Sequence, residues 1–247
     1  MNKSLPAIID FLFPRHCSVC GKRLHVGEES LCTSCLMDLH LVDYADGREG
    51  NKLERSLWED LPVVRAASFL VYDRENSQRQ LVLDLKYHNR PKIGEHLAPI
   101  MVRKLNTTGF FDGVDVILPI PISGKRREHR GYNQSESIAR GISRHTGIPV
   151  DTRSLKRRHY ATSQTKLSVA QRRENIKGTF LLRHPDRLRG KHILIVDDVI
   201  TSNNTILACG HALMQIPGIS ISVLSLAVSR NHIRNIRISN PQPESDN

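Results

Sequence analysis

The segment from residue 192 to residue 205, HILIVDDVITSNNT, constrains the fold of this 247-residue chain more than any other. Its aliphatic run predicts a buried strand, and the polar residues after the two acids predict the start of a helix. Further strands are predicted at residues 67–72, 114–119, 179–182 and 219–227, and helices at 77–88, 93–105, 133–145 and 204–215. Strands that alternate with helices indicate an α/β domain with a parallel sheet.

The two acids of this segment, Asp197 and Asp198, are expected at the carboxyl end of their strand, where ligands of parallel sheets bind. The backbone N–H groups and hydroxyls that follow favour an anion at a helix N-terminus. Two carboxylates beside such an anion site would bind sugar hydroxyls and not the phosphate itself. The simpler alternative is a strand end that only caps a helix.

Four of the five cysteines form two C-x-x-C pairs, Cys17 with Cys20 and Cys32 with Cys35. Two such pairs complete the tetrahedral sulfur shell of a structural Zn²⁺. Two disulfides would instead need an oxidising compartment, and a thioredoxin-type redox site would need only one pair. The spacing favours a zinc module at residues 1–42, a polar linker at 43–62, the α/β domain at 63–239 and a disordered tail at 240–247.

The formal net charge of +11 is concentrated in one contiguous stretch of the chain. Residues 123–190 contain 17 Lys or Arg and 5 Asp or Glu, a local +12 that leaves about −1 elsewhere. Such a field attracts nucleic acid or a multiply phosphorylated small molecule, and the alternative is a solvated basic face without a partner.

Two basic segments make up this stretch. The first follows the strand at 114–119 and is expected to point its cations at the Asp197 loop, where they suit pyrophosphate with Mg²⁺. Its cations are Lys125, Arg126, Arg127 and Arg130. The second is rich in hydroxyls and is typical of a loop over an active site or of a nucleic-acid arm. We assign nucleic-acid binding to its residues Lys156, Arg157, Arg158, Lys166, Arg172 and Arg173.

No run of about 18 apolar residues is present, so the sequence predicts no membrane-spanning helix. The apolar segment at residues 5–13, LPAIIDFLF, is not followed by a cleavage pattern and does not resemble a signal peptide. We therefore expect a cytoplasmic protein. The apolar segment either packs against its own domain or touches the inner face of the membrane.

The Asp-Asp segment resembles the signature of the type I phosphoribosyltransferases, in which two acids hold the ribose hydroxyls and the next loop grips the 5′-phosphate. The resemblance implies that Asp197 and Asp198 bind ribose at the catalytic centre. The implied phosphate loop consists of Thr201, Ser202, Asn203, Asn204 and Thr205. Asn203 stands where the signature has a glycine; it enters the left-handed region more readily than other residues, but its side chain adds bulk beside the phosphate.

Four blocks in order along the chain resemble the ComF/GntX family. These are the paired C-x-x-C motifs, residues 118–134 (LPIPISGKRREHRGYNQ), residues 157–180 (RRHYATSQTKLSVAQRRENIKGTF) and the Asp-Asp segment. Members of that family join a zinc module to a phosphoribosyltransferase-like domain. ComF members act in natural transformation, and GntX-like members are tied to the use of DNA as a nutrient.

This resemblance implies three kinds of partner: single-stranded DNA, phosphoribosyl pyrophosphate with Mg²⁺, and DNA-uptake or recombination proteins. It leaves three functions open. The first is a DNA-uptake protein that binds single-stranded DNA, the second an active phosphoribosyltransferase, and the third a regulator that senses a phosphoribosyl ligand and acts through protein partners. The fold alone does not decide whether transfer is catalysed.

Overall fold

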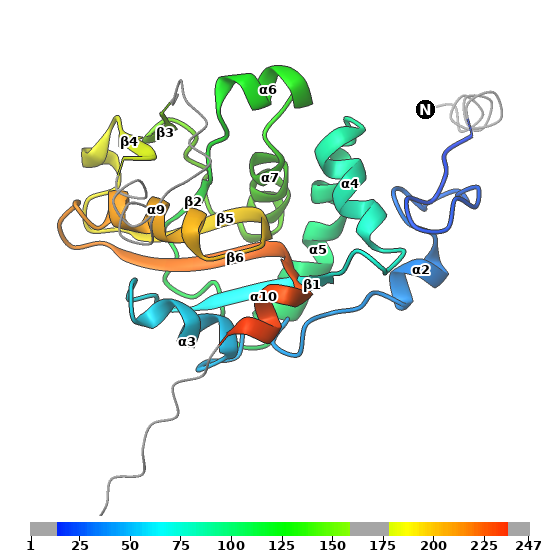
Figure 1. Ribbon diagram of the computed structural model, residues 1–247, viewed down its shortest axis with the longest axis horizontal. Coiled ribbons are helices and arrows are strands. Elements are labelled where there is room, and N and C mark those ends of the chain that lie inside the picture. Colours follow the sequence, from blue (N-terminus) through cyan, green and yellow to red (C-terminus); the bar gives the residue numbers. More distant parts are fainter. Residues whose placement is uncertain (1–13, 159–177, 237–247) are drawn as a thin grey trace, which may run out of the picture.

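The computed structural model describes residues 14–158 and 178–236 (Figure 1). Its main sheet has the spatial order β1 (Ala66–Tyr72), β6 (Ser220–Ser229), β5 (His192–Ile200) and β2 (Val116–Pro119). All three neighbouring pairs are parallel. An isolated parallel bridge between Val150 and Ile117 continues the sheet on the far side of β2. The predicted parallel α/β architecture is therefore confirmed.

Helices α4 (Arg79–Tyr87), α5 (Lys92–Asn106) and α7 (Gln134–Thr146) lie on one side of the sheet, above it in Figure 1. Two glycines allow α5 and α7 to cross closely. A Cβ atom on Gly141 would meet the Cβ of Ala98 at 2.7 Å, and one on Gly94 would meet the Oγ of Ser137 at 2.8 Å. Because packed interiors leave no such room, larger residues at these two positions would push the helices apart.

The described residues form several further elements. They are α2 (Thr33–Met37), α3 (Lys52–Trp58), α6 (Gly124–Arg130), β3 (Leu155–Arg157), β4 (Phe180–Leu182), a 3₁₀ turn (Pro185–Arg187), α9 (Asn204–Leu213) and α10 (Arg230–Asn235). β3 and β4 form an antiparallel pair outside the main sheet, so the strand predicted at 179–182 exists but belongs to this hairpin.

Helix α7 begins as predicted, and its first turn is capped by Asn133 alone. The Asn133 side chain accepts the N–H of Ser135 at 3.2 Å and so caps the helix. The carboxylate of Glu136 accepts instead from Arg140 at 2.7 Å and from Arg127 at 3.2 Å. Glu136 therefore links α7 to α6, because two guanidinium groups compete for it.

The expectation that residues 43–62 form a linker is wrong. Helix α3 lies inside this range, and Leu53, Leu57 and Leu61 are fully buried. These leucines recur every four residues, which is typical of one face of a helix. The polar residues around them favoured the prediction of a linker instead. The zinc module and the α/β domain share one hydrophobic cluster, which includes both Cys17 and Val228. The boundary expected near residue 42 therefore remains a prediction.

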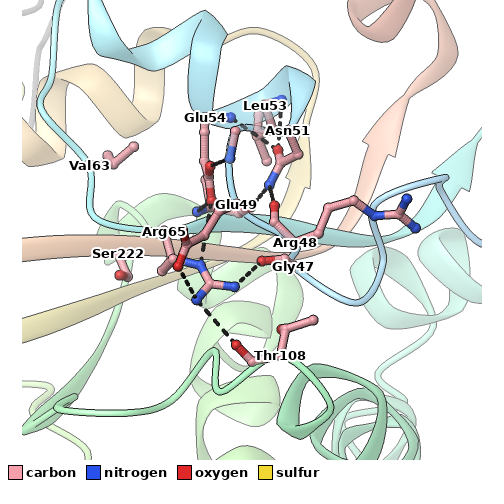
Figure 2. A network of polar contacts seen from close by, with 12 residues as sticks. Gly47, Arg48, Glu49, Asn51, Leu53, Glu54, Val63, Arg65, Thr108 and Ser222 are labelled. Carbon is pink, nitrogen blue, oxygen red and sulfur yellow. Dashed lines mark hydrogen bonds and ion pairs between the residues drawn. The ribbon is translucent and has the colours of Figure 1, made fainter.

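Figure 2 shows the polar network that fixes this segment to the sheet. The buried carboxylate of Glu54 accepts the backbone N–H groups of Gly50 and Ala66. Arg65 donates to the carbonyl of Gly47 at 2.5 Å and to that of Thr108 at 3.3 Å. Buried polar groups with these partners hold a segment in one position, which a linker would not need.

Residues 5–13 and 240–247, about which the sequence made predictions, lie outside the described residues. In the part of the chain that the structure describes, no helix is long and apolar enough to cross a membrane.

Candidate functional site

The four predicted cysteines form one compact cluster. All four Sγ atoms lie within 4.8 Å of one another, and those of Cys20 and Cys32 are 3.7 Å apart. A tetrahedral shell of Zn–S bonds of about 2.3 Å places its sulfurs about 3.8 Å apart, whereas a disulfide requires about 2.05 Å. The donor set and its spacing fit a structural Zn²⁺, and the four thiols are not joined as disulfides.

A carboxylate that is not a zinc ligand ties the two cysteine pairs together. Glu28 accepts the backbone N–H groups of His25 and Thr33, together with the Thr33 hydroxyl. These hydrogen bonds lower the pKa of Glu28 to about 2. The second pair lies at the start of α2, where Cys32 is the residue before the helix.

The zinc module docks on the α/β domain through polar contacts. Ser30 Oγ and His96 Nδ1 are 2.7 Å apart. Arg90 donates at 3.1 Å both to the Oγ of Ser18, which lies between two zinc ligands, and to the buried carboxylate of Asp84 in α4. The module is thus connected to α4 by one arginine.

The two acids of the Asp-Asp segment lie within strand β5 and not after its end. Strand β2 stops at Pro119, opposite Val196, but β5 continues beside β6 as far as Ile200. From the sequence alone, the strand is expected to end with its aliphatic run at Val196. In the structure β6 provides a partner for four more residues, so β5 extends to Ile200. Asp197 and Asp198 therefore occupy an overhang that is open on the β2 side.

The two acids have different surroundings. Asp197 accepts from the hydroxyl of Ser135 at 3.2 Å and from the N–H of Asp198 at 2.9 Å. Asp198 lies 3.4 Å from the ammonium group of Lys86. Burial, and then the charge of Asp198, raise the pKa of Asp197 to about 7. Near neutral pH, Asp197 is thus able to accept or donate a hydrogen bond, as the recognition of hydroxyl groups requires.

Helices α4 and α7 deliver the partners of these acids. Lys86 is on α4 and Ser135 is on α7. Tyr132, just before α7, donates its hydroxyl to the carbonyl of Leu85 and so joins the two helices beside the acids. Burial and the nearby charge of Asp198 raise the pKa of Tyr132. These positioning contacts keep the carboxylate pair in one geometry.

Two of the four cations predicted on the first basic segment are already engaged. The segment forms helix α6 and not a turn, and α6 rises beyond α7 in Figure 1. Arg127 binds Glu136, and the Arg130 guanidinium lies 5.4 Å from the ring centroid of Tyr87. Lys125 and Arg126 are exposed.

The nucleic-acid residues predicted on the second basic segment separate into three groups. Lys156 and Arg158 are exposed, whereas Arg157 is partly buried with its guanidinium 5.4 Å from the ring centroid of Phe180. Lys166, Arg172 and Arg173 lie outside the described residues.

Arg157 lies in the electrostatic neighbourhood of the candidate site. Burial and the charge of Arg126 lower the pKa of Arg157, and the charge of Asp197 opposes this shift. The charge of Arg157, in the second basic segment, thus interacts both with Arg126 of the first segment and with Asp197.

The phosphate loop does not need a glycine at residue 203. Asn203 has φ −70° and ψ −11°, which every L-residue adopts, so this position does not use the left-handed conformation that asparagine tolerates. Its amide donates to the carbonyl of Ser56 at 2.9 Å and to the Ser56 hydroxyl at 3.1 Å, and its carbonyl oxygen lies 2.9 Å from His232 Nε2. The side chain is thus hydrogen-bonded to α3 and to α10.

Sequence reasoning missed Lys86, Ser135 and His232. Ser135 is buried in the capped first turn of α7, and its hydroxyl donates to Asp197. Lys86 is 112 positions away from Asp198 in the chain, and no spacing rule connects a lysine in a helix with a distant strand.

Comparisons with known proteins agree with this architecture. Residues 8–46 match the double zinc ribbon domain. The chain is 27% identical over 213 residues to DNA utilization protein YhgH of Salmonella typhi, covering 85% of this chain and 88% of the relative. It is 27% identical over 234 residues to Competence protein F of Haemophilus influenzae, covering 87% of this chain and 97% of the relative.

Solved structures of similar shape include a glutamine phosphoribosylpyrophosphate amidotransferase from B. subtilis, with a TM-score of 0.38, 18% identity and 57% of this chain covered. The match spans only 30% of that enzyme. A hypothetical protein from Neisseria gonorrhoeae with bound ppGpp has a TM-score of 0.39 and 17% identity, with 56% of this chain and 68% of the other covered. Similarities this weak assign neither a site nor an activity.

The protein is thus a parallel-sheet α/β protein with an N-terminal four-cysteine zinc module. Its relatives along most of the chain, together with the double zinc ribbon, support its assignment to the ComF family.

Proposed function

We propose that this protein acts in DNA uptake and that it binds both single-stranded DNA and a phosphoribosyl ligand. The relatives named for DNA utilization and for competence support the cellular role. The observation that supports the biochemical part is the pairing of Asp198 with Lys86, together with the interaction between the charges of Asp197 and Arg157.

Each part of the phosphoribosyl ligand would contact the residues whose chemistry suits it. The carboxylates of Asp197 and Asp198 suit the ribose hydroxyls, and Ser135 keeps one of them in place. The exposed hydroxyls of Thr201 and Ser202 precede the N-terminus of α9, which favours the 5′-phosphate. The exposed cations of α6 suit the pyrophosphate, whose oxygens would hold most of the Mg²⁺ coordination shell.

Single-stranded DNA would lie over the β3–β4 hairpin. Lys156 and Arg158 are exposed there and are free to neutralise backbone phosphates. Arg157 belongs to strand β3 of the hairpin, and its charge interacts with both Arg126 and Asp197, so the field that would attract DNA also reaches the candidate phosphoribosyl site. We therefore expect the two ligands to compete.

The experiment is an anisotropy titration of a labelled oligodeoxythymidine at 50 and 200 mM salt, with and without phosphoribosyl pyrophosphate and Mg²⁺. We expect affinity to fall at least tenfold at the higher salt, because phosphate contacts release counterions. The variant K156E/R158E should weaken DNA binding by at least tenfold and leave ligand binding intact. DNA affinity that ignores both salt and these substitutions would refute the DNA part of the proposal.

A regulatory role for the zinc module is a second candidate, favoured by the contacts of Arg90. This side chain joins Ser18 of the module to Asp84, two residues before the lysine that pairs with Asp198. An Arg90→Ala variant should change the affinity for phosphoribosyl pyrophosphate at least threefold while keeping its zinc. Unchanged affinity in a folded, zinc-loaded variant would remove this candidate.

A further inference from the structure

A second basic site lies at the amino ends of strands β2 and β5, opposite the carboxyl ends where Asp197 and Asp198 lie. A cavity of about 610 Å³ opens there, within the usual size range of small-molecule sites. Its walls come from the start of β2, the segment after α7, the 3₁₀ turn and the residue before β5. They are lined by Val116, Arg140, residues 149–153, Arg187 and Lys191.

This cavity is separate from the candidate phosphoribosyl site. Val116 is the first residue of β2, and Lys191 immediately precedes β5. Asp197 follows Lys191 by six residues along an extended strand, which corresponds to about 20 Å. A small ligand in the cavity would not reach the acids at the carboxyl edge.

The cavity has an excess of positive charge. Four cations line it, and Asp151 is its single carboxylate. The Asp151 carboxylate is already occupied, since it accepts the Ser154 hydroxyl at 2.6 Å and the N–H of Arg153 at 2.7 Å. The hydrogen bond from Ser154 and the charge of Arg187 help to hold the pKa of Asp151 below its usual value, against the effect of burial.

Three of the four cations are available to a ligand. Arg140 pairs with Glu136 at 2.7 Å. Within residues 14–158 and 178–236, Arg153, Arg187 and Lys191 form no ion pair with a carboxylate. Like charges gathered in one hollow repel one another, so an anion bound there would relieve the repulsion and gain charge-assisted hydrogen bonds.

The backbone around the cavity is held in place without a ligand. Ile117 of β2 donates its N–H to the carbonyl of Pro149 and accepts from the N–H of Asp151, both at 2.9 Å. Ser220 donates its N–H to the carbonyl of Lys191 at 3.1 Å. The cations are therefore presented by a rigid rim, which lowers the entropic cost of binding.

We propose that this cavity binds a small molecule that carries two or more phosphate groups. Three cations that form no ion pair among the described residues exceed what one phosphate needs, and two of them are guanidinium groups, which bind phosphate in a bidentate manner. No aromatic ring is among the residues that line the cavity, so it offers no stacking platform for the bases of a nucleic-acid strand.

The test is isothermal titration calorimetry of the full chain with two probes, inorganic tripolyphosphate and ATP, and with citrate as a non-phosphate trianion. We expect both phosphate probes to bind and the double variant R187Q/K191Q to weaken them at least tenfold. All titrations use the K125Q/R126Q background, which removes the exposed cations of the phosphoribosyl site. In that background R103Q/K104Q, which removes the same charge from the last turn of α5, should leave this binding event within twofold. Arg153→Gln, a single change at an exposed position, should weaken the probes in the same direction.

Three results would overturn the proposal. The first is unchanged tripolyphosphate affinity in R187Q/K191Q with a thermal transition like that of the wild type. The second is citrate binding as tight as that of tripolyphosphate. The third is a loss of oligodeoxythymidine binding in R187Q/K191Q with no loss of tripolyphosphate binding, which would assign the cavity to a DNA strand. Because the K125Q/R126Q background lacks the exposed cations of the phosphoribosyl site, these results are distinguishable from a failure of the proposed function.

Discussion

The zinc module and the carboxyl edge of the sheet both gather like charges, but they stabilise them by opposite means. In the module, four sulfurs lie within 4.8 Å of one another and fit a divalent cation that would neutralise them. At the sheet edge, the fold itself holds Asp197 beside Asp198, with Lys86 as the paired cation. The thiolates of the module therefore stabilise its fold through the cation that they would bind. The repulsion between Asp197 and Asp198 instead lowers the stability of the α/β domain, and the surrounding elements hold the two acids in place.

The largest expected effect is on the module. Cys17→Ser removes one of four ligands, and because the binding energy of a structural zinc is folding energy, the module should unfold while the α/β sheet remains. Zinc content should fall from about one per chain to near zero, and the far-UV circular dichroism of the sheet should persist. Cys209→Ser, at a buried cysteine outside the cluster, is the control and should retain its zinc. A zinc content equal to that of the wild type in Cys17→Ser would contradict the assignment.

A smaller effect is expected at the loop after β5. Asn203→Ala removes the hydrogen bonds to Ser56 and His232 and leaves their partners unsatisfied, which should lower the free energy of unfolding by about 1–3 kcal/mol. Urea denaturation measures this loss. Because the side chain is engaged by Ser56 and His232, binding of phosphoribosyl pyrophosphate should change less than threefold under conditions where the variant is folded. Tighter binding by tenfold would show that the asparagine does obstruct the phosphate.

The smallest expected change in the free energy of unfolding comes from replacing Asp197 at the carboxyl ends of the strands or Asp151 near their amino ends, and the two changes should have opposite signs. The pKa of Asp197 is raised to about 7, so the folded chain holds more protons than the unfolded chain between about pH 4 and pH 7. The contribution of this group is present at low pH and is lost as the pH rises through about 7. Asp197→Asn should therefore increase the free energy of unfolding at pH 8, by about 1–2 kcal/mol.

The pKa of Asp151 is lowered, so the opposite sign is expected for its substitution. Asp151→Asn should destabilise the protein at pH 7, and the difference from the wild type should shrink as the pH falls below about 4. Chemical denaturation at a series of pH values measures both variants. Destabilisation by Asp197→Asn at pH 8 would show that the carboxylate is not under electrostatic strain.

The sequence predicted the features that are local and missed those that depend on distant partners. The cysteine pairs and the aliphatic run of β5 are contiguous patterns, so the zinc cluster and the parallel sheet followed from them. The end of β5 depends on β6, and the role of Lys86 depends on a contact between α4 and β5. The conformation of Asn203 depends on α3 and α10, which no local rule places beside the loop.

The central claim is that Asp197 and Asp198 hold a phosphoribosyl ligand at the carboxyl edge. Calorimetric titration of phosphoribosyl pyrophosphate with Mg²⁺ into the wild type and into D197N/D198N tests it most directly. We expect binding to the wild type and a loss of affinity of about 100-fold in the double variant, since each carboxylate accepts a hydrogen bond of about 1.5–3 kcal/mol from the ribose hydroxyls. Equal affinity in the two proteins, or no binding to the wild type, would contradict the claim.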